Sequence, residues 1–354
     1  MPQPELNLKI NQFISLKNYN SFQLNAQSHH FVELHERSDF KKLLDKHGGQ
    51  SIFTLGGGSN ILLVEKEISV LIAHINTKGI QTVNESDRNV QVKIEAGEIW
   101  DDVVQWTVER GYGGIENLTL IPGKIGAAPI QNIGAYGVEL KDTLIACEFI
   151  DKSTGELREV DNAFCQFGYR DSIFKNELRN KVIITAITLN LSKDGFHQYN
   201  TSYGAISNHL LENFSNEINL TTIRETVRQI RTSKLPDPKI IGNSGSFFKN
   251  PIVSQQQLKH IQEQFPDVVH FPVDKDKVKI AAGWMIEKLD GKKWTVGGAG
   301  VHHKQALVLI NKKNATGMDL LELSKRIQSN VFEHFGVHLE TEVNIIDHKY
   351  TCQL

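Results

Sequence analysis

The chain has 354 residues, of which 40% are hydrophobic, and a formal net charge of −2. This length leaves room for two or three domains, and the balanced charge argues against a nucleic-acid partner. Cys147, Cys165 and Cys352 lack the spacing of a disulfide framework or of a thiolate zinc site. The N-terminus has no signal-peptide pattern, and no run approaches the ~20 apolar residues of a membrane span. We therefore expect a cytoplasmic protein that is neither exported nor embedded in a membrane.

The first hundred residues show alternating strand and helix signals. Residues 38–47 are expected to form a short helix with Ser38 as its N-cap and Gly48 as its stop. A second helix is expected over residues 99–110, closed by Gly111, with Trp100, Val103, Val104 and Thr107 on one buried face. Strands are expected at residues 52–55, 61–64, 70–75 and 90–97.

A run of glycines, Gly56, Gly57 and Gly58, followed by Ser59 and Asn60, connects two of these strands. Such a run can present a nest of backbone amides to an anion. The spacing matches neither the dinucleotide-binding Rossmann turn nor the P-loop, because the next segment is a strand and not a helix. A tight hairpin explains the run about as well when it is taken alone.

A second glycine-rich segment spans residues 115–140, in which Gly123, Gly126, Gly134 and Gly137 stand among very few charged residues. A loop of this composition offers backbone N–H groups and positive φ angles instead of side chains. It predicts a cradle for a large anionic ligand such as a dinucleotide diphosphate. A tightly turned loop pair between strands is the alternative.

The last third of the chain opens with a helix that starts at Thr221 and ends at Leu235, before Pro236, Asp237 and Pro238. Two prolines around an aspartate form a stiff connection and a plausible domain boundary. Further helices are expected at residues 255–265, 280–289 and 318–335, with strands at 307–310 and 343–346. We expect about 15 N-terminal residues to be poorly ordered or to pack peripherally.

Seven motifs in order resemble the UDP-N-acetylenolpyruvoylglucosamine reductase (MurB) family, in its longer type with a tyrosine loop. They are GGGSN (56–60), IPGKIGAAPIQNIGAYG (121–137), FGYRDSIFK (167–175), KLPDPKIIGNSGSFFKNP (234–251), AAGWMIEK (281–288), HHKQALVLIN (302–311) and LETEV (339–343). The last departs from the usual pattern, because Thr341 replaces a proline often found there.

The resemblance implies an α+β flavoprotein of three domains, with a two-part FAD-binding region of the PCMH/VAO-like kind and a C-terminal substrate-binding α+β domain. The expected division is residues 1–83 with 337–354, then 84–232, then 233–336. The C-terminal segment is thereby expected to return and pack on the first domain.

The implied reaction is the NADPH-dependent reduction of an enolpyruvyl ether of UDP-N-acetylglucosamine through noncovalent FAD, in peptidoglycan synthesis. Ser246 would supply the proton that such a reduction needs, and the alternative is a serine that merely hydrogen-bonds a glycine turn. Arg170 and Glu342 would neutralise the enolate, although Arg170 could instead pair with Asp171. The choice of Glu342 over Glu340 rests on the resemblance, and its role needs a raised pKa.

The resemblance also assigns binding residues. The expected FAD-binding residues are Gly56, Gly57, Gly58, Ser59, Asn60, Pro122, Gly123, Gly126, Ala127, Ile130 and Gly134. The expected substrate-binding residues are Tyr136, Tyr169, Tyr203, Lys234, Asn250 and Gln305. Lys234 could instead simply interact favourably with the dipole at the C-terminus of a helix, and Tyr203 could be an exposed loop residue.

No metal site is expected, because the adjacent His302 and His303 point differently and no third ligand has the right spacing. The expected partners are small molecules only, and the chain is expected to be a monomer. Two rival functions stay open: an FAD-dependent sugar or lactone oxidase on the same scaffold, and a non-catalytic protein that binds nucleotide sugars.

Overall fold

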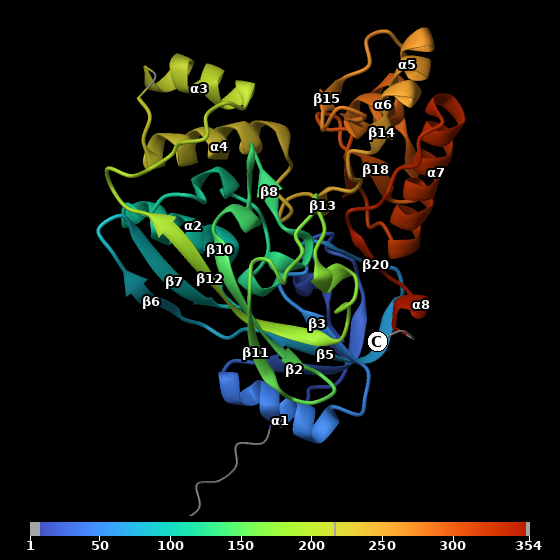
Figure 1. Cartoon of the computed structure of the whole chain (residues 1–354). Coiled ribbons are helices and arrows are strands. Elements are labelled where there is room, and N and C mark those ends of the chain that lie inside the picture. The colour runs from blue at the N-terminus through green and yellow to red at the C-terminus, as the bar shows by residue number, and fades with distance from the viewer. Residues whose placement is uncertain (1–7, 216, 352–354) are drawn as a thin grey trace, which may run out of the picture.

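The computed structural model of the chain describes residues 8–215 and 217–351. Its α-helices are α1 (Arg37–His47), α2 (Trp100–Glu109), α3 (Gly204–Phe214), α4 (Leu220–Lys234), α5 (Gln255–Gln264), α6 (Ala282–Lys288), α7 (Gly317–Phe335) and α8 (His348–Thr351). Short 3-10 helices are η1 (Lys17–Tyr19), η2 (Glu116–Leu118), η3 (Ile125–Ala127), η4 (Pro129–Gln131), η5 (Leu140–Asp142), η6 (Ile173–Lys175) and η7 (Gly291–Lys293). Figure 1 shows α3 and α4 on one side and α5, α6 and α7 on the other, above two larger sheets, with α1 below them. Parallel and antiparallel sheets occur together, so the predicted α+β class is confirmed.

The first sheet has the order β1 (Ile14–Ser15), β2 (Gln27–Leu34), β5 (Glu67–Ile75) and β3 (Ile52–Leu55). Strands β2, β5 and β3 run parallel, and β1 joins the outer edge of β2 in the antiparallel sense. Residues 1–7 of the N-terminal extension lie outside the described residues, and Asn11 with β1 packs at the edge of this sheet. Strand β3 leads directly into the glycine run at Gly56.

Helix α1 covers this sheet and begins one residue earlier than expected. Its N-cap is Glu36, whose backbone N–H donates to the Asp39 carboxylate at 3.0 Å, while the Asp39 N–H donates to the Glu36 carbonyl at 3.0 Å. The prediction of Ser38 as N-cap is therefore wrong, because the helix begins at Arg37 and the Asp39 carboxylate accepts from the backbone N–H groups of His35 and Glu36. Gly48 ends the helix as expected.

The second sheet is antiparallel, in the order β11 (Leu157–Asp161), β10 (Leu144–Asp151), β12 (Val182–Ser192), β7 (Asn89–Glu95) and β6 (Ile80–Glu85). Strand β7 buries alternate residues, as the alternation of its sequence predicts. Helix α2 packs on this sheet with Trp100, Val103, Val104 and Thr107 buried, which confirms the expected face. Strand β6 contains residues from both sides of the expected boundary at 83/84, and the division into domains stays a prediction.

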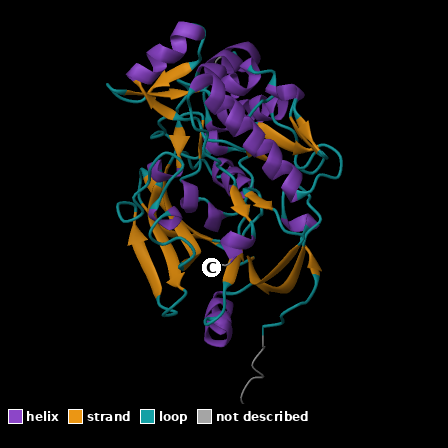
Figure 2. Ribbon diagram, turned by 90° about the vertical axis from the view of Figure 1, so that its right-hand side faces the viewer, coloured by secondary structure: helices purple, strands orange, loops and turns teal. Residues whose placement is uncertain are grey.

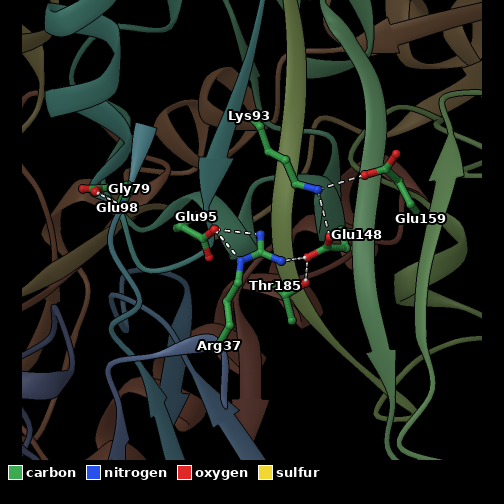
Figure 3. A network of polar contacts seen from close by, with 8 residues as sticks. All are labelled: Arg37, Gly79, Lys93, Glu95, Glu98, Glu148, Glu159 and Thr185. Carbon is green, nitrogen blue, oxygen red and sulfur yellow. Dashed lines mark hydrogen bonds and ion pairs between the residues drawn. The ribbon is translucent and has the colours of Figure 1, made fainter. Parts of the chain in front are cut away.

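A charge network around a buried carboxylate, Glu148, joins α1 to the second sheet (Figure 3). Arg37 lies 2.7 Å from the Glu95 carboxylate on β7 and 2.8 Å from that of Glu148 on β10. Lys93 and the Thr185 hydroxyl also donate to Glu148. Glu148 is only 5% exposed. Carboxylates this buried need such donors, because an unpaired buried charge is costly.

We expect Arg37→Met to lower the free energy of unfolding by about 2 kcal/mol, because it leaves Glu95 unpaired and weakens the neutralisation of Glu148. Arg228 pairs with Glu225 on the exposed face of α4, so Arg228→Met should cost less than about 1 kcal/mol. Denaturant unfolding of both variants checks this difference. Equal losses would show that the network adds nothing beyond a surface ion pair.

The C-terminal part carries two small sheets. One has the order β13 (Asn243–Ser246), β19 (Val308–Asn311), β18 (Ala299–Val301) and β17 (Thr295–Val296), and the other has β14 (Ile252–Ser254), β16 (Lys277–Ile280) and β15 (His270–Pro272). Figure 2 shows most helices in the upper half of the molecule and the two larger sheets below. Ile280 belongs to β16, so the helix expected over 280–289 is wrong at its start, since α6 begins at Ala282.

The chain then returns to its beginning. Strand β20 (Asn344–Ile346) pairs in parallel with β4 (Ile61–Leu63), which confirms the expected return of the C-terminal segment. Because β3 pairs with β5 and β4 pairs with β20, the run from Gly56 to Asn60 connects strands of different sheets. The tight-hairpin alternative is therefore wrong.

Candidate functional site

A single cavity lies between the two glycine-rich segments. Its wall includes every residue expected to bind the cofactor: Gly56, Gly57, Gly58, Ser59, Asn60, Pro122, Gly123, Gly126, Ala127, Ile130 and Gly134. The first segment enters from β3, and the second descends through η3 and η4 to the short hairpin of β8 (Gly134–Ala135) and β9 (Val138–Glu139). The fold thus brings two distant segments to one surface.

The two segments are in direct backbone contact. A Cβ added to Gly57 would lie 3.0 Å from the Cα of Gly123, and Ser59 Oγ donates to the Pro122 carbonyl at 3.0 Å. Gly58 and Gly123 both have positive φ, of 62° and 122°. Glycine is required here because larger residues would either clash or strain the backbone. The resulting surface presents peptide groups to a ligand, as a diphosphate cradle requires.

The charge of the cavity wall also suits an anionic ligand. Among the described residues that line it, Glu342 is the single carboxylate, whereas five side chains are cationic. These are Lys124, Arg170, Lys175, Arg179 and Arg231. The rest of the wall combines uncharged polar side chains with apolar ones, and Trp100, Ile121 and Phe174 are among the apolar members. A flat aromatic group with attached phosphates fits this combination.

Arg170 and Glu342 form an ion pair at the wall of the cavity. Arg170 Nε lies 3.0 Å from Glu342 Oε1, and its Nη2 donates to the Gly134 carbonyl at 2.6 Å. Asp171 instead accepts from Ser172 and Asn176, so the alternative of an Arg170 and Asp171 pair is wrong. Arg170 has a φ of 54°, an unfavourable backbone conformation that these contacts hold in place.

Ser246 and Glu342 reach the same cavity on adjacent strands of backbone. Ser246 is the last residue of β13, and the Glu342 N–H donates to the carbonyl of the next residue, Phe247, at 2.8 Å. Thr341 forms a bridge to Phe248, while Glu340 turns away to pair with Lys249. The structure thereby separates the two glutamates that the sequence leaves ambiguous.

Burial raises the pKa of Glu342, although Arg170 opposes the rise. A protonated or proton-sharing carboxyl beside an arginine fork can hold a carboxylate that gains negative charge. Ser246, Arg170 and Glu342 all line the cavity. The arrangement can therefore bind an acid group and deliver a proton beside it.

None of the six expected substrate residues, all of which the structure describes, lines the wall of this cavity itself. Tyr136 and Tyr203 form an edge-to-face pair with ring centroids 5.3 Å apart, and Tyr203 is 48% exposed at the start of α3. Tyr169 packs beside Arg170 and hydrogen-bonds Asn250. Lys234 is the last residue of α4, and Gln305 lies beside Gly283 of α6. Their role in binding stays a prediction.

Sequence reasoning missed Arg231, a buried member of the cavity wall. Its guanidinium donates to the Leu120 carbonyl at 3.2 Å and hydrogen-bonds Tyr136, while its Nε has no partner. Arg231 directly follows Ile230, which belongs to the buried apolar face of α4. This position beside the buried face was the one signal in the sequence that could have indicated Arg231. Lys175 also lines the cavity and was missed. It ends the motif FGYRDSIFK, in which the resemblance assigned roles only to Tyr169 and Arg170.

Among residues 8–215 and 217–351, no group of three or more His, Cys, Asp or Glu side chains could hold a metal ion. No helix in that part of the chain is long and apolar enough to cross a membrane.

Comparisons with known proteins agree with these observations. The family model of the FAD binding domain matches residues 30–161, and that of the C-terminal domain of UDP-N-acetylenolpyruvoylglucosamine reductase matches residues 237–346. The expected FAD-binding region and C-terminal domain are thereby confirmed. A structure of this reductase from Thermus caldophilus has the same fold, with a TM-score of 0.69, 20% identity, and coverage of 96% of this chain and 100% of its own.

Close relatives match over nearly the whole chain. The UDP-N-acetylenolpyruvoylglucosamine reductase of Flavobacterium johnsoniae is 46% identical over 96% of this chain and 100% of its own length. That of Pseudomonas putida is 40% identical, over 94% and 97% respectively. The chain therefore belongs to the UDP-N-acetylenolpyruvoylglucosamine reductase family.

Proposed function

We propose that this chain uses NADPH and noncovalently bound FAD to reduce UDP-N-acetylglucosamine enolpyruvate to UDP-N-acetylmuramate, a step of peptidoglycan precursor synthesis. The observation that carries the proposal is the ion pair of Arg170 and Glu342, 3.0 Å apart, in the wall of a cavity that also contains both glycine-rich segments and Ser246. A cofactor cradle and groups for an enolate thus meet in one place.

The cavity fits FAD by its chemistry. The glycines of both segments leave the backbone bare for the diphosphate, and the apolar wall near Trp100 and Phe174 suits the ring system. When bound, FAD would supply hydride chemistry, taking a hydride from NADPH and returning it to the methylene carbon of the enolpyruvyl group. The protein residues act on the other end of that double bond.

Arg170 and Glu342 would hold the substrate carboxylate as negative charge develops on it. The arginine offers two donors in a fixed fork, and the raised pKa of Glu342 lets its carboxyl share a proton with the enolate. Ser246 would then protonate the carbon beside that carboxylate. A serine is a weak acid, so this step needs a strongly basic carbanion and a site closed to water.

The sugar nucleotide would be held at the opening of the cavity. Support comes from Tyr136 and Tyr203, which lie together beside α3 and α4, and from Arg231, which links Tyr136 to the cavity wall. We assign Tyr169, Asn250, Lys234 and Gln305 to the same task. The proposal includes a monomer that works in the cytoplasm on small molecules alone.

The proposal is tested by purifying the chain and adding NADPH without oxygen. The protein should be yellow, NADPH should bleach the flavin absorbance, and UDP-N-acetylglucosamine enolpyruvate should restore it. Recovery with a sugar alcohol or lactone plus oxygen would favour the oxidase alternative. A colourless protein that binds the sugar nucleotide would favour the non-catalytic alternative.

The cradle can be tested by Gly126→Val. A Cβ at Gly126 would lie 2.8 Å from the Cβ of Ala96, so η3 must move away from the end of β7. Overpacking of this kind costs about 1–3 kcal/mol, and we expect FAD affinity to fall about tenfold or more. A Cβ at Gly49 meets nothing within 4 Å, so Gly49→Val is the control. Equal FAD content in both variants would contradict the cradle.

A further inference from the structure

Beneath the glycine cradle lies a cluster of polar side chains to which the proposed mechanism gives no task. Lys124 follows Gly123 in the second segment, and its side chain crosses to the end of β5. Its Nζ donates to the Ile75 carbonyl at 2.6 Å and to Asn76 Oδ1 at 3.3 Å, and it lies 2.9 Å from His74 Nε2. The lysine thus spans from the cofactor loop to the first sheet.

The protons of this cluster can be assigned from its contacts. An ammonium group only donates, so His74 Nε2 must accept from Lys124. His74 Nδ1 then carries the proton and donates to Glu33 Oε1 at 3.1 Å. Burial lowers the pKa of His74, and the charge of Lys124 lowers it further, which keeps the ring neutral as this assignment requires. Each proton of the ammonium group therefore has an acceptor.

The cluster contacts both glycine segments. A Cβ at Gly56 would meet the Cβ of Lys124 at 3.8 Å. The ring of Tyr19 lies edge to face with His74 at 5.1 Å, and the Tyr19 carbonyl occupies the space where Gly58 would carry a side chain. A movement of Lys124 would therefore disturb both walls of the cradle.

We propose that Lys124, oriented by His74 and Glu33, is a positioning residue for FAD: it fixes the loop of Pro122 to Ala127 against β5 and adds positive charge to the cavity wall beside the glycine cradle. This inference rests on the proposed function, since it needs FAD in the cavity. It concerns the middle residue of the PGKIG run, for which the sequence itself indicates no role.

The charge on Lys124 gives the proposal a pH signature. Burial and, to a smaller extent, the neighbouring Lys78 together lower the pKa of Lys124 to about 8, against the attraction of Glu33. The other charged or titratable groups around it are His74, His35 beside Glu33, Glu98 beside Lys78, and the Tyr19 phenol. Bound phosphate favours the ammonium form. FAD affinity should therefore be full below about pH 8 and fall as the pH rises through that value.

The test measures the FAD dissociation constant of the full-length chain, stripped of flavin and titrated with FAD, between about pH 7 and 10. Lys124→Met removes the ammonium and keeps the chain length. Hydrogen bonds to a charged group contribute enough that we expect affinity to fall about 10- to 100-fold at pH 7. The decline of affinity above about pH 8 should also disappear.

Two further variants separate positioning from general damage. His74→Phe can pack against Tyr19 and Phe31 and leaves two Lys124 contacts intact, so it should weaken FAD binding by less than Lys124→Met. Lys152 is a buried lysine outside the cavity wall; its Nζ donates to the Ile52 carbonyl at 2.8 Å, and burial lowers its pKa to about 8. Lys152→Met should leave FAD affinity within about twofold of the parent.

The inference is overturned if Lys124→Met binds FAD within about twofold of the parent at pH 7. It is also overturned if Lys152→Met weakens binding equally, or if the parent and Lys124→Met share one pH profile. If the parent chain takes up no FAD, the proposed function itself fails and the inference with it. A parent that binds FAD tightly and a Lys124→Met that binds it equally well would remove the inference alone.

Discussion

Ser246→Ala is expected to retain FAD and its bleaching by NADPH, yet to slow the return of flavin absorbance with the enolpyruvyl sugar by at least about 10²–10⁴. The first half reaction protonates no substrate carbon, whereas the second does. Ser246 reaches the cavity at the end of β13, beside the backbone that carries Glu342. Stopped-flow absorbance measured separately for the two half reactions checks the difference.

Ser246→Cys is the matched variant for this experiment. A thiol occupies nearly the same place and can give up a proton, so part of the lost rate should return. If Ser246→Ala reacts with the enolpyruvyl sugar at the parent rate, the proton comes from another group or from water. If both half reactions slow equally, Ser246 instead shapes the cavity.

Much of the fold can be predicted because its elements have strong local signals. Strand β7 alternates buried and exposed residues, and α2 repeats its apolar residues at helical spacing. Strand β2 was not predicted, since its polar Gln27, His29 and Glu33 interrupt the apolar run. The start of α6 was misplaced because the apolar residues of β16 lead into it with a single residue between.

The two halves of the glycine cradle could be predicted because the residues of each half are close in the chain and glycine reports directly on backbone geometry. The ion-pair partner of Arg170 could not be predicted, because Glu342 comes close to Arg170 only when β20 returns to pair with β4. The sequence cannot show whether Glu340 or Glu342 faces the cavity. In the structure Thr341 forms a bridge to Phe248, and Glu340 pairs with Lys249. Arg231 was missed since only packing shows that this helix residue is buried at the cavity.

Arg170→Met should lower kcat/KM for the enolpyruvyl sugar by about 10²–10³, the cost of removing a group that stabilises developing oxyanion charge. The variant also loses the bond to the Gly134 carbonyl and leaves Glu342 without its cation. The pKa of Glu342, already raised by burial, should then rise further, because Arg170 is the largest opposing influence on it. Arg170→Lys keeps the charge without the fork and should recover only part of the loss.

Arg228→Met on the exposed face of α4 is the control for arginine removal and should keep parent activity. NADPH should still bleach the flavin of Arg170→Met at a rate much closer to that of the parent. If Arg170→Met instead slows only the reduction of the flavin by NADPH and reacts normally with the enolpyruvyl sugar, Arg170 binds NADPH and does not stabilise the enolate.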